Sequence, residues 1–330
     1  MRSWLRERLV CPRDHDPLVF EKARIRCSRG HDYRIVDDIP ILLLKDEPST
    51  QPSITQLAEE APATGAPQAV WAGDGVHPFV QESIAATNGI LYRPLIGKLT
   101  RYPIPILRLP EASGATFLDI GCNWGRWSVA AARKGYRPVG IDHSLPAIRA
   151  ARDVCRQLHL EAEFLVADSR WLPFRAESFD AVFSYSVLQH FERTDCVRAL
   201  SEIGRVLKAG GTSLVQMANR YGLRSLFHQA RRGFRPAKEF EVRYWSPRQL
   251  REAFTPAVGP CALSVDGFFG LGIQRNDIDL LPLHYKAVVA ASELLRAASR
   301  RVSPLARFAD SLYVESKKGG EPERAQALLA

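Results

Sequence analysis

The chain has 330 residues, a formal net charge of +9 at pH 7 and a hydrophobic fraction of 46%. These values are typical of a globular protein with one large domain or two smaller ones. No run approaches the roughly 20 apolar residues that a membrane-spanning helix needs, and the N-terminus lacks the apolar core of a secretory signal. Six scattered cysteines do not form a disulfide framework, so we expect a protein of the reducing cytoplasm. We expect a monomer or a homodimer, and the moderate positive charge permits an anionic partner without requiring nucleic acid.

Residues 1–46 form the first predicted unit, in which two short segments with Cys and His precede an apolar run. The segments are Cys11-Pro-Arg-Asp14-His15 and Cys27-Ser-Arg-Gly-His31, and residues 39–44 read Ile-Pro-Ile-Leu-Leu-Leu. A unit this small needs a metal ion or a docking partner to hold together. We expect residues 39–44 to be the strand that docks on the main domain.

Residues 47–77 are rich in Pro, Ala, Ser, Thr and Gln and poor in large apolar side chains, which predicts a linker. Residues 78–112 return to amphipathic patterning with prolines as breakers. They predict one or two helices that cover the binding cleft of the domain that follows.

An apolar strand over residues 115–118 then leads into an acid and a glycine-rich turn, Asp119-Ile-Gly121-Cys122-Asn123-Trp-Gly125. The two glycines let the backbone turn tightly and approach a ligand that a Cβ atom would block. The helix from about residue 126 directs its N-terminal N–H groups toward that ligand.

Further strands and helices alternate from this turn to residue 218, with polar residues where the strands end. A second strand, 136–141, ends at Asp142, and a helix over 145–159 precedes a third strand, 162–166. The fourth strand, 181–185, a helix over 194–207 and a fifth strand, 212–217, complete the predicted core, residues 113–218. An acid at the end of the second strand, roughly 20 residues past the glycines, is the expected partner of ribose hydroxyls.

These motifs resemble those of the class I S-adenosylmethionine (SAM) methyltransferases. Asp119–Gly125 is similar to their D-x-G-x-G-x-G motif, and Arg-Val-Leu-Lys-Ala-Gly-Gly at 205–211 is similar to the turn before their fifth strand. The resemblance implies an α/β fold with a Rossmann-like seven-stranded sheet, SAM as cofactor and methyl transfer as activity. Asn123 replaces the family's middle glycine, and we expect a positive φ there, which Asn tolerates better than most residues.

The resemblance also implies roles for individual residues. Asp142 would bind the ribose and Asp168 the adenine amino group, whereas His190, after the fourth strand, is the best candidate for a general base. A base is needed only if the acceptor is a hydroxyl or a similar acid, and a purely structural role for His190 remains an alternative. The implied cofactor-binding set is Asp119, Gly121, Cys122, Asn123, Gly125, Asp142, His143, Asp168, Ser169 and Ser184.

The N-terminal unit resembles the small Trm112-like zinc-ribbon module found beside many methyltransferases. The second cysteine of that module's first pair is replaced by Asp14 here, so the candidate ligands are Cys11, Asp14 or His15, Cys27 and His31. Zinc accepts Cys, His and Asp in tetrahedral sites. The alternative is a degenerate module that has lost its metal and kept its packing.

Residues 219–245 are basic and interleaved with aromatic residues, which suggests a lid over the active site. We expect Tyr185, Arg231, Arg235 and Tyr244 to contact an anionic acceptor, such as a phosphorylated or carboxylated metabolite, a lipid-linked sugar or RNA. The alternative is a solvated helix whose aromatic side chains anchor it to the core. Residues 246–317 would complete the fold with a helix capped by Ser246, strands at 262–269 and 311–315, and a helix over 286–301. Residues 318–330 read as a flexible tail.

Three functions remain open at this point. The first is a methyltransferase for a small-molecule or lipid- or sugar-linked acceptor, and the second is an RNA methyltransferase with a zinc-ribbon RNA-binding module. The third is a non-catalytic scaffold, against which the intact acids Asp119, Asp142 and Asp168 argue. The fourth strand is followed by no Asn/Asp-Pro-Pro-Tyr/Phe motif, which argues against methylation of base amino groups in nucleic acid.

Overall fold

The computed structural model of the protein describes residues 1–47, 71, 73–270, 272 and 274–319. Residues 48–70 and 72 of the predicted linker and residues 320–330 of the predicted tail therefore lie outside the described residues. Among the helices of the described residues, none combines the length and the apolar character that crossing a membrane requires.

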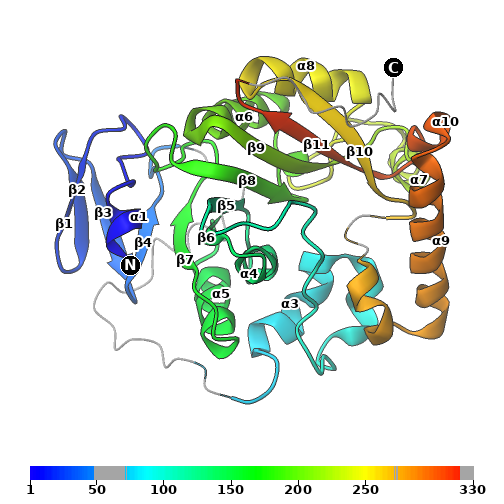
Figure 1. Ribbon diagram of the computed structural model, residues 1–330, viewed down its shortest axis with the longest axis horizontal. Helices are drawn as coiled ribbons and strands as arrows, with labels where there is room; N and C mark the ends of the chain where they lie inside the picture. Colours follow the sequence, from blue (N-terminus) through cyan, green and yellow to red (C-terminus); the bar gives the residue numbers. More distant parts are fainter. Residues whose placement is uncertain (48–70, 72, 271, 273, 320–330) are drawn as a thin grey trace.

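One sheet of eleven strands runs through the molecule, in the order β1-β2-β3-β4-β7-β6-β5-β8-β9-β11-β10 (Figure 1). The strands are β1 (Leu18–Phe20), β2 (Arg24–Cys27), β3 (Asp32–Val36), β4 (Ile39–Leu42), β5 (Thr116–Ile120), β6 (Arg137–Asp142), β7 (Glu163–Ala167), β8 (Phe179–Tyr185), β9 (Leu207–Ala218), β10 (Cys261–Gly267) and β11 (Ser311–Lys317). From β7 to β9 neighbouring strands are parallel, and β11 is antiparallel to both β9 and β10. The seven strands from β7 to β10 form the predicted Rossmann-like α/β sheet, which confirms the fold class.

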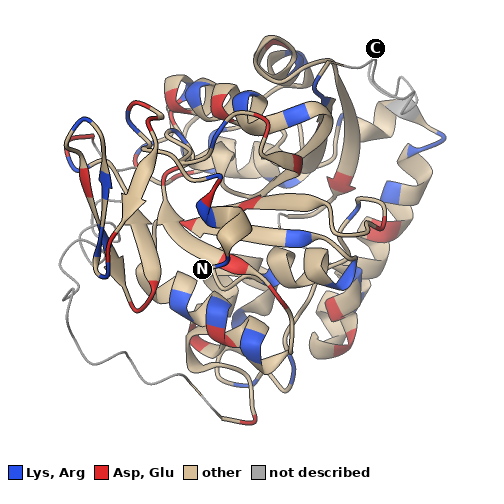
Figure 2. Cartoon of the chain, turned by 60° about the vertical axis from the view of Figure 1, so that its left-hand side comes forward, with Lys and Arg blue, Asp and Glu red and all other residues tan. Residues whose placement is uncertain are grey.

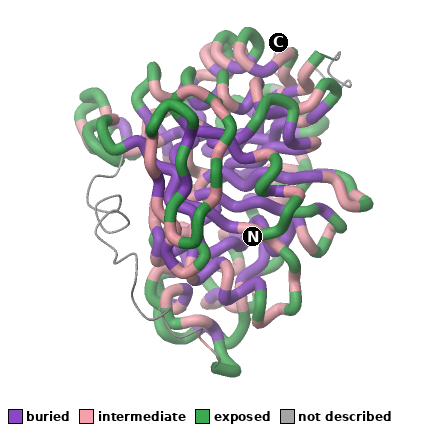
Figure 3. Tube along the Cα trace, turned by 90° about the vertical axis from the view of Figure 1, so that its left-hand side faces the viewer, coloured by how far each residue is buried: buried purple, intermediate pink, exposed green. Residues whose placement is uncertain are grey.

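Helices cover both faces of this sheet (Figure 1). The helices are α1 (Ser3–Arg6), α3 (Pro78–Asn88), α4 (Arg126–Arg133), α5 (Leu145–Gln157), α6 (Arg193–Val206), α7 (Leu223–Arg231), α8 (Pro247–Ala257), α9 (Leu283–Ser299) and α10 (Ser303–Ala306), with short 3-10 helices η1 (Ile90–Leu95), η2 (Leu188–His190) and η3 (Arg275–Leu280). Because side chains alternate along a strand, Phe117 of β5 packs into the core under α3, α4 and α5, and Leu118 packs into the core under α6 and α8. The strands in the middle of the sheet are accordingly buried along most of their length (Figure 3).

The N-terminal strands extend the sheet at the β7 edge. Strand β4 pairs in parallel with β7, Ile41 opposite Val166 and Leu42 opposite Ala167, as expected for residues 39–44. The guanidinium of Arg149 on α5 donates to the carboxylate of Asp37 at 2.8 Å, which adds a polar tie to the same junction. The first four strands and the methyltransferase-like strands therefore share one continuous hydrogen-bonded sheet.

The sequence predicts the start of α8 correctly and the start of β9 only in part. Ser246 caps α8, its hydroxyl accepting from the N–H of Gln249 while the Gln249 side chain accepts from the N–H of Ser246. Strand β9 begins five residues before the predicted Thr212, but its residues 208–211 do not pair with the neighbouring strand β8. Leu207 pairs with Phe179 and Thr212 pairs with Ala181, so the four residues between them bulge out.

Candidate functional site

The turn after β5 brings backbone close to the carboxyl ends of the neighbouring strands. Gly121 has φ +69°, and a Cβ atom there would lie 2.2 Å from Cγ2 of Val187. Only glycine therefore fits at this position. Asn123 has φ +46°, which confirms the expected positive φ, and its side-chain oxygen accepts from the N–H of Trp124 at 2.8 Å.

Asp119 lies beneath this turn and is buried. Its side chain shares the α4 side of β5 with Phe117, is 1% exposed and accepts from the hydroxyl of Ser128 at 2.7 Å. Burial raises the pKa of Asp119 to about 7, although the hydrogen bonds from Ser128 oppose that rise. The residue supports the turn from below.

Asp142 ends β6 and faces the turn. One carboxylate oxygen accepts from the N–H of Asn123 at 3.0 Å, and the other accepts from the N–H of Ser144 at 2.9 Å. Each oxygen keeps a second lone pair, so the carboxylate can also accept from two hydroxyl groups of a ligand. Burial raises the pKa of Asp142, and the two backbone hydrogen bonds counteract this.

A cavity of about 410 Å³ opens at this edge of the sheet, within the size range of small-molecule sites. Among the described residues, it is lined by seven that the sequence predicted for the cofactor, the acceptor or catalysis: Gly121, Asn123, Asp142, His143, Ser169, Tyr185 and His190. Five others of the predicted cofactor set lie outside the lining: Asp119, Cys122, Gly125, Asp168 and Ser184. Helix α3 contributes Phe79 and Thr87, as expected for a helix that covers the cleft. The glycine cradle, the free lone pairs of Asp142 and the volume together fit SAM.

Asp168 faces the protein and not the cavity. Its carboxylate accepts from Nη2 of Arg170 at 2.7 Å and lies 3.5 Å from Nε2 of His143. Burial would raise the pKa of Asp168, but the hydrogen bonds and charges of His143 and Arg170 outweigh it and hold that pKa well below its usual range. The neighbouring Ser169 lines the cavity in its place.

His190 lies on η2 with its ring stacked on Phe240, the ring centroids being 4.1 Å apart. Its Nδ1 lies 2.7 Å from the Phe240 carbonyl oxygen, and because a carbonyl only accepts, Nδ1 carries the proton. Burial lowers the pKa of His190, the bond to Phe240 raises it in part, and Arg243 lowers it further. The neutral ring therefore keeps a basic Nε2.

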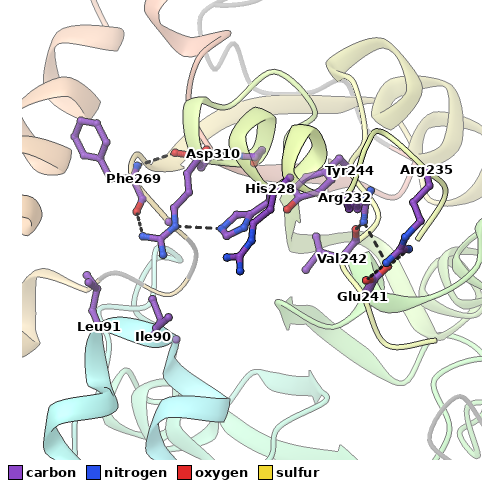
Figure 4. Close-up of a pocket in the computed structure, with 15 residues that line it drawn as sticks. Ile90, Leu91, His228, Arg232, Arg235, Glu241, Val242, Tyr244, Phe269 and Asp310 are labelled. Carbon is purple, nitrogen blue, oxygen red and sulfur yellow. Dashed lines mark hydrogen bonds and ion pairs between the residues drawn. The ribbon is translucent and has the colours of Figure 1, made fainter. Parts of the chain in front are cut away.

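A second cavity, of about 770 Å³, holds most of the predicted acceptor residues (Figure 4). Arg231, Arg235 and Tyr244 line it, whereas Tyr185 lines the first cavity and donates to Asp266 at 2.7 Å. The sequence did not predict the rest of the lining from distant segments, which comprises residues 89–91, 269–270 and Asp310. No local motif marks those residues; only the fold brings them together.

The four predicted metal ligands come together in the N-terminal unit. The ligand atoms of Cys11, Asp14, Cys27 and His31 all lie within 4.8 Å of one another. Nδ1 of His31 lies 3.4 Å and 3.3 Å from the two sulfurs and 3.0 Å from Oδ2 of Asp14. The edges of a tetrahedral zinc site with these ligand types measure about 3.3–3.8 Å. The separations here, from 3.0 Å to at most 4.8 Å, bracket that range, so small side-chain shifts would let the four residues hold one zinc ion. His15, the alternative ligand, lies instead 3.9 Å from Glu202.

Comparison with known proteins places the central part of the chain. Residues 117–211 match the family model described as a methyltransferase domain. Over 106 residues the chain is 34% identical to the probable tRNA methyltransferase 9B of Homo sapiens, covering 32% of this chain and 22% of that protein. Over 114 residues it is 32% identical to the ubiquinone biosynthesis O-methyltransferase of Brucella ovis, covering 33% of this chain and 45% of that protein.

A solved structure, the complex between the Haloferax volcanii Trm112 methyltransferase activator and the putative methyltransferase, matches at 23% identity and a TM-score of 0.45, covering 64% of this chain and 86% of that chain. The chain spans about a fifth of the length of the first curated relative and less than half of the second. The family match identifies residues 117–211 as a methyltransferase domain, which confirms the resemblance of this part of the chain to the SAM-dependent methyltransferases.

Proposed function

We propose that the protein transfers a methyl group from SAM to an anionic small-molecule acceptor, or to a lipid- or sugar-linked one. The observation that carries this proposal is the cavity at the carboxyl ends of β5, β6 and β8, where Asp142 faces the turn at Gly121. Open α/β sheets bind ligands at this place. When bound, SAM supplies an electrophilic methyl group. Asp142 would accept from the ribose hydroxyls, and Ser169 and Phe79 would form walls of the site.

His190 would serve as the general base of this reaction. Phe240 fixes the ring in the tautomer whose Nε2 is free to accept a proton, and burial keeps the ring neutral at physiological pH. Placement beside the cofactor cavity would let Nε2 take the proton of an acceptor hydroxyl as the methyl group is transferred.

RNA is the second candidate acceptor, since the curated relatives include a probable tRNA methyltransferase. In the part of the chain that Figure 2 brings forward, positions of Lys and Arg are interspersed with positions of Asp and Glu and form no single basic patch or stripe of the kind that marks nucleic-acid-binding proteins. Steep weakening of RNA binding with salt would favour RNA. We also propose that Cys11, Asp14, Cys27 and His31 hold zinc, which would stabilise the N-terminal strands.

A thermal-shift measurement with SAM tests the proposed cofactor site. A ligand at about 100 times its Kd stabilises the folded chain by about 2.7 kcal/mol. Asp142→Ala should remove most of that effect, because each lost hydrogen bond to a charged group is worth about 1.5–3 kcal/mol. Glu252→Ala, on the exposed side of α8, is the control. Unchanged SAM binding by Asp142→Ala would contradict the placement.

Activity is tested by incubating the full chain with radiolabelled SAM and a cell extract. Label in the low-molecular-weight or lipid fraction would support the proposed acceptor class, and label in the RNA fraction would favour the second candidate. Absence of SAM binding altogether would favour a scaffold.

A further inference from the structure

The second cavity adjoins the cofactor cavity along two segments of chain. At the end of α3, Ala86 and Thr87 line the cofactor cavity and Gly89–Leu91 line the second one. In the basic segment, Phe240 lines the first cavity and Glu241 and Val242 line the second. The two cavities are therefore neighbours along these two segments.

The two carboxylates that line this second cavity already accept hydrogen bonds from the protein. Glu241 accepts a two-pronged contact from Arg235, at 2.7 and 2.8 Å, which removes Arg235 from the groups free to bind an acceptor. Asp310 accepts from the N–H of Ser225 at 2.8 Å and from the N–H of Phe269 at 2.7 Å. The hydrogen bonds of both carboxylates are therefore made within the protein.

The groups that remain are donors. Arg224 donates to the Phe269 carbonyl at 3.1 Å and its Nε lies 3.3 Å from Nε2 of His228 (Figure 4). Since a guanidinium cannot accept, Nε2 of His228 is the acceptor and Nδ1 of that ring carries a proton. Burial lowers the pKa of His228, and the charges of Arg224 and Arg231 lower it further, so the ring is a neutral donor. Within the described part of the chain, the guanidinium of Arg231 has no hydrogen-bond or ion-pair partner.

The charges of the lining leave a positive excess. Arg224, Arg231, Arg232 and Arg235 are four cations, and Glu241 and Asp310 are two carboxylates, so four minus two leaves +2. A phosphate monoester carries about −1.5 to −2 at neutral pH. Arginine is also the side chain best suited to a phosphate, because its planar fork presents several donors at once.

The opposite wall is apolar. Ile90 and Leu91 lie across the cavity from His228 and Arg232 in Figure 4, and Val242 and Phe269 also line it. Ile90 is 56% exposed, so inorganic phosphate alone would leave it in water, whereas an alkyl or isoprenoid chain would bury its exposed surface at about 25 cal/mol for each Å². The cavity therefore matches a molecule that joins an anionic head to an apolar body.

We propose that the second cavity binds the phosphate monoester of an amphiphilic acceptor, with Arg224, His228 and Arg231 on the phosphate and Ile90 and Leu91 along the apolar body. Phosphate binding stands by itself; the role of the bound molecule as methyl acceptor rests on the proposed function. Under this proposal, Arg224 and His228 would contact the phosphate in place of Arg235, which the sequence suggested.

Titration calorimetry on the full chain tests the proposal with four probes: octyl phosphate, inorganic phosphate, the neutral amphiphile octyl glucoside, and phosphatidylcholine vesicles with and without phosphatidic acid. Octyl phosphate should bind at least about tenfold more tightly than inorganic phosphate and octyl glucoside. Added affinity for phosphatidic acid vesicles would identify a membrane-held acceptor, and binding of octyl phosphate alone a freely diffusing one. Binding to the vesicles without binding to octyl phosphate would overturn the cavity assignment.

Arg231→Gln should weaken octyl phosphate binding by at least about tenfold, since it removes a charge-assisted contact. Arg248→Gln is the matched control, because the Arg248 side chain is 88% exposed and pairs with Glu252 away from this cavity. His228→Gln supplies a second test should Arg231→Gln unfold. Equal losses in Arg231→Gln and Arg248→Gln, or equal affinity for octyl glucoside, would overturn the proposal. SAM binding is measured on the same samples, so a failure of the cofactor site is distinguished from a failure of the phosphate site.

Discussion

Replacing Asp119 with Asn should change how stability depends on pH. The Asp119 carboxyl is 1% exposed, and burial raises its pKa to about 7 from an ordinary value of 3.8. Between these two values the folded chain holds a proton that the unfolded chain has released, so stability falls as pH rises. A difference of about three units corresponds to about 4 kcal/mol, of which about 2.5 kcal/mol is lost between about pH 5 and about pH 8.

The variant Asp119→Asn keeps the size of the side chain and an oxygen that can accept from Ser128, but it does not titrate. Its stability relative to the wild type should therefore rise by about 2.5 kcal/mol between about pH 5 and about pH 8. Urea unfolding at a series of pH values measures this, with Glu252→Gln on the exposed side of α8 as the control. A difference between Asp119→Asn and wild type that does not change with pH would refute the reasoning, because Asp119 would then titrate alike in both states.

Three further predictions follow from the sites. His190→Gln should lower the initial rate by about 10²–10⁴-fold while SAM binding persists. Because burial lowers the pKa of His190, the wild-type rate should fall only at pH values below those at which an ordinary histidine becomes protonated. Retained activity in the variant would exclude His190 as base. Elemental analysis should find zinc in the wild type and none in Cys27→Ser. A chelator should lower the melting temperature of the wild type but not that of the variant. Wild-type protein purified without metal would exclude the zinc site. Asn123→Gly should keep SAM binding and thermal stability, but Asn123→Ala should lose about 1–2 kcal/mol through its positive φ; equal melting temperatures would count against this.

The strands of the core and the turn at Asn123 could be predicted because their determinants are local. A buried strand followed by glycines needs only its own residues to specify a tight turn, and the positive φ at Asn123 follows from the neighbouring geometry. The docking strand at residues 39–44 was also visible as an apolar run that had to be covered.

The partners of individual charged side chains could not be predicted from the sequence. Asp168 was expected in the cofactor site, yet Arg170, two residues later, holds its carboxylate. Arg235 was expected to bind the acceptor, yet Glu241 engages it. Each of these charged side chains could meet either a ligand or an opposite charge of the protein, and the folded backbone decides which one it meets. The lining of the second cavity depends in the same way on the fold, because it combines residues such as Ile90 and Asp310 that lie far apart in the chain.

The parallel pairing of β4 with β7 has a consequence for synthesis of the chain. Ile41 pairs with Val166, so 125 residues must be added to the chain after Ile41 before its partner exists. At about 5–20 residues per second, the apolar edge of β4 remains without its partner strand for about 6–25 s. An edge of this kind invites pairing with other nascent chains. A metal ion at Cys11, Asp14, Cys27 and His31 would fold the first strands during that interval, ahead of the sheet they later join.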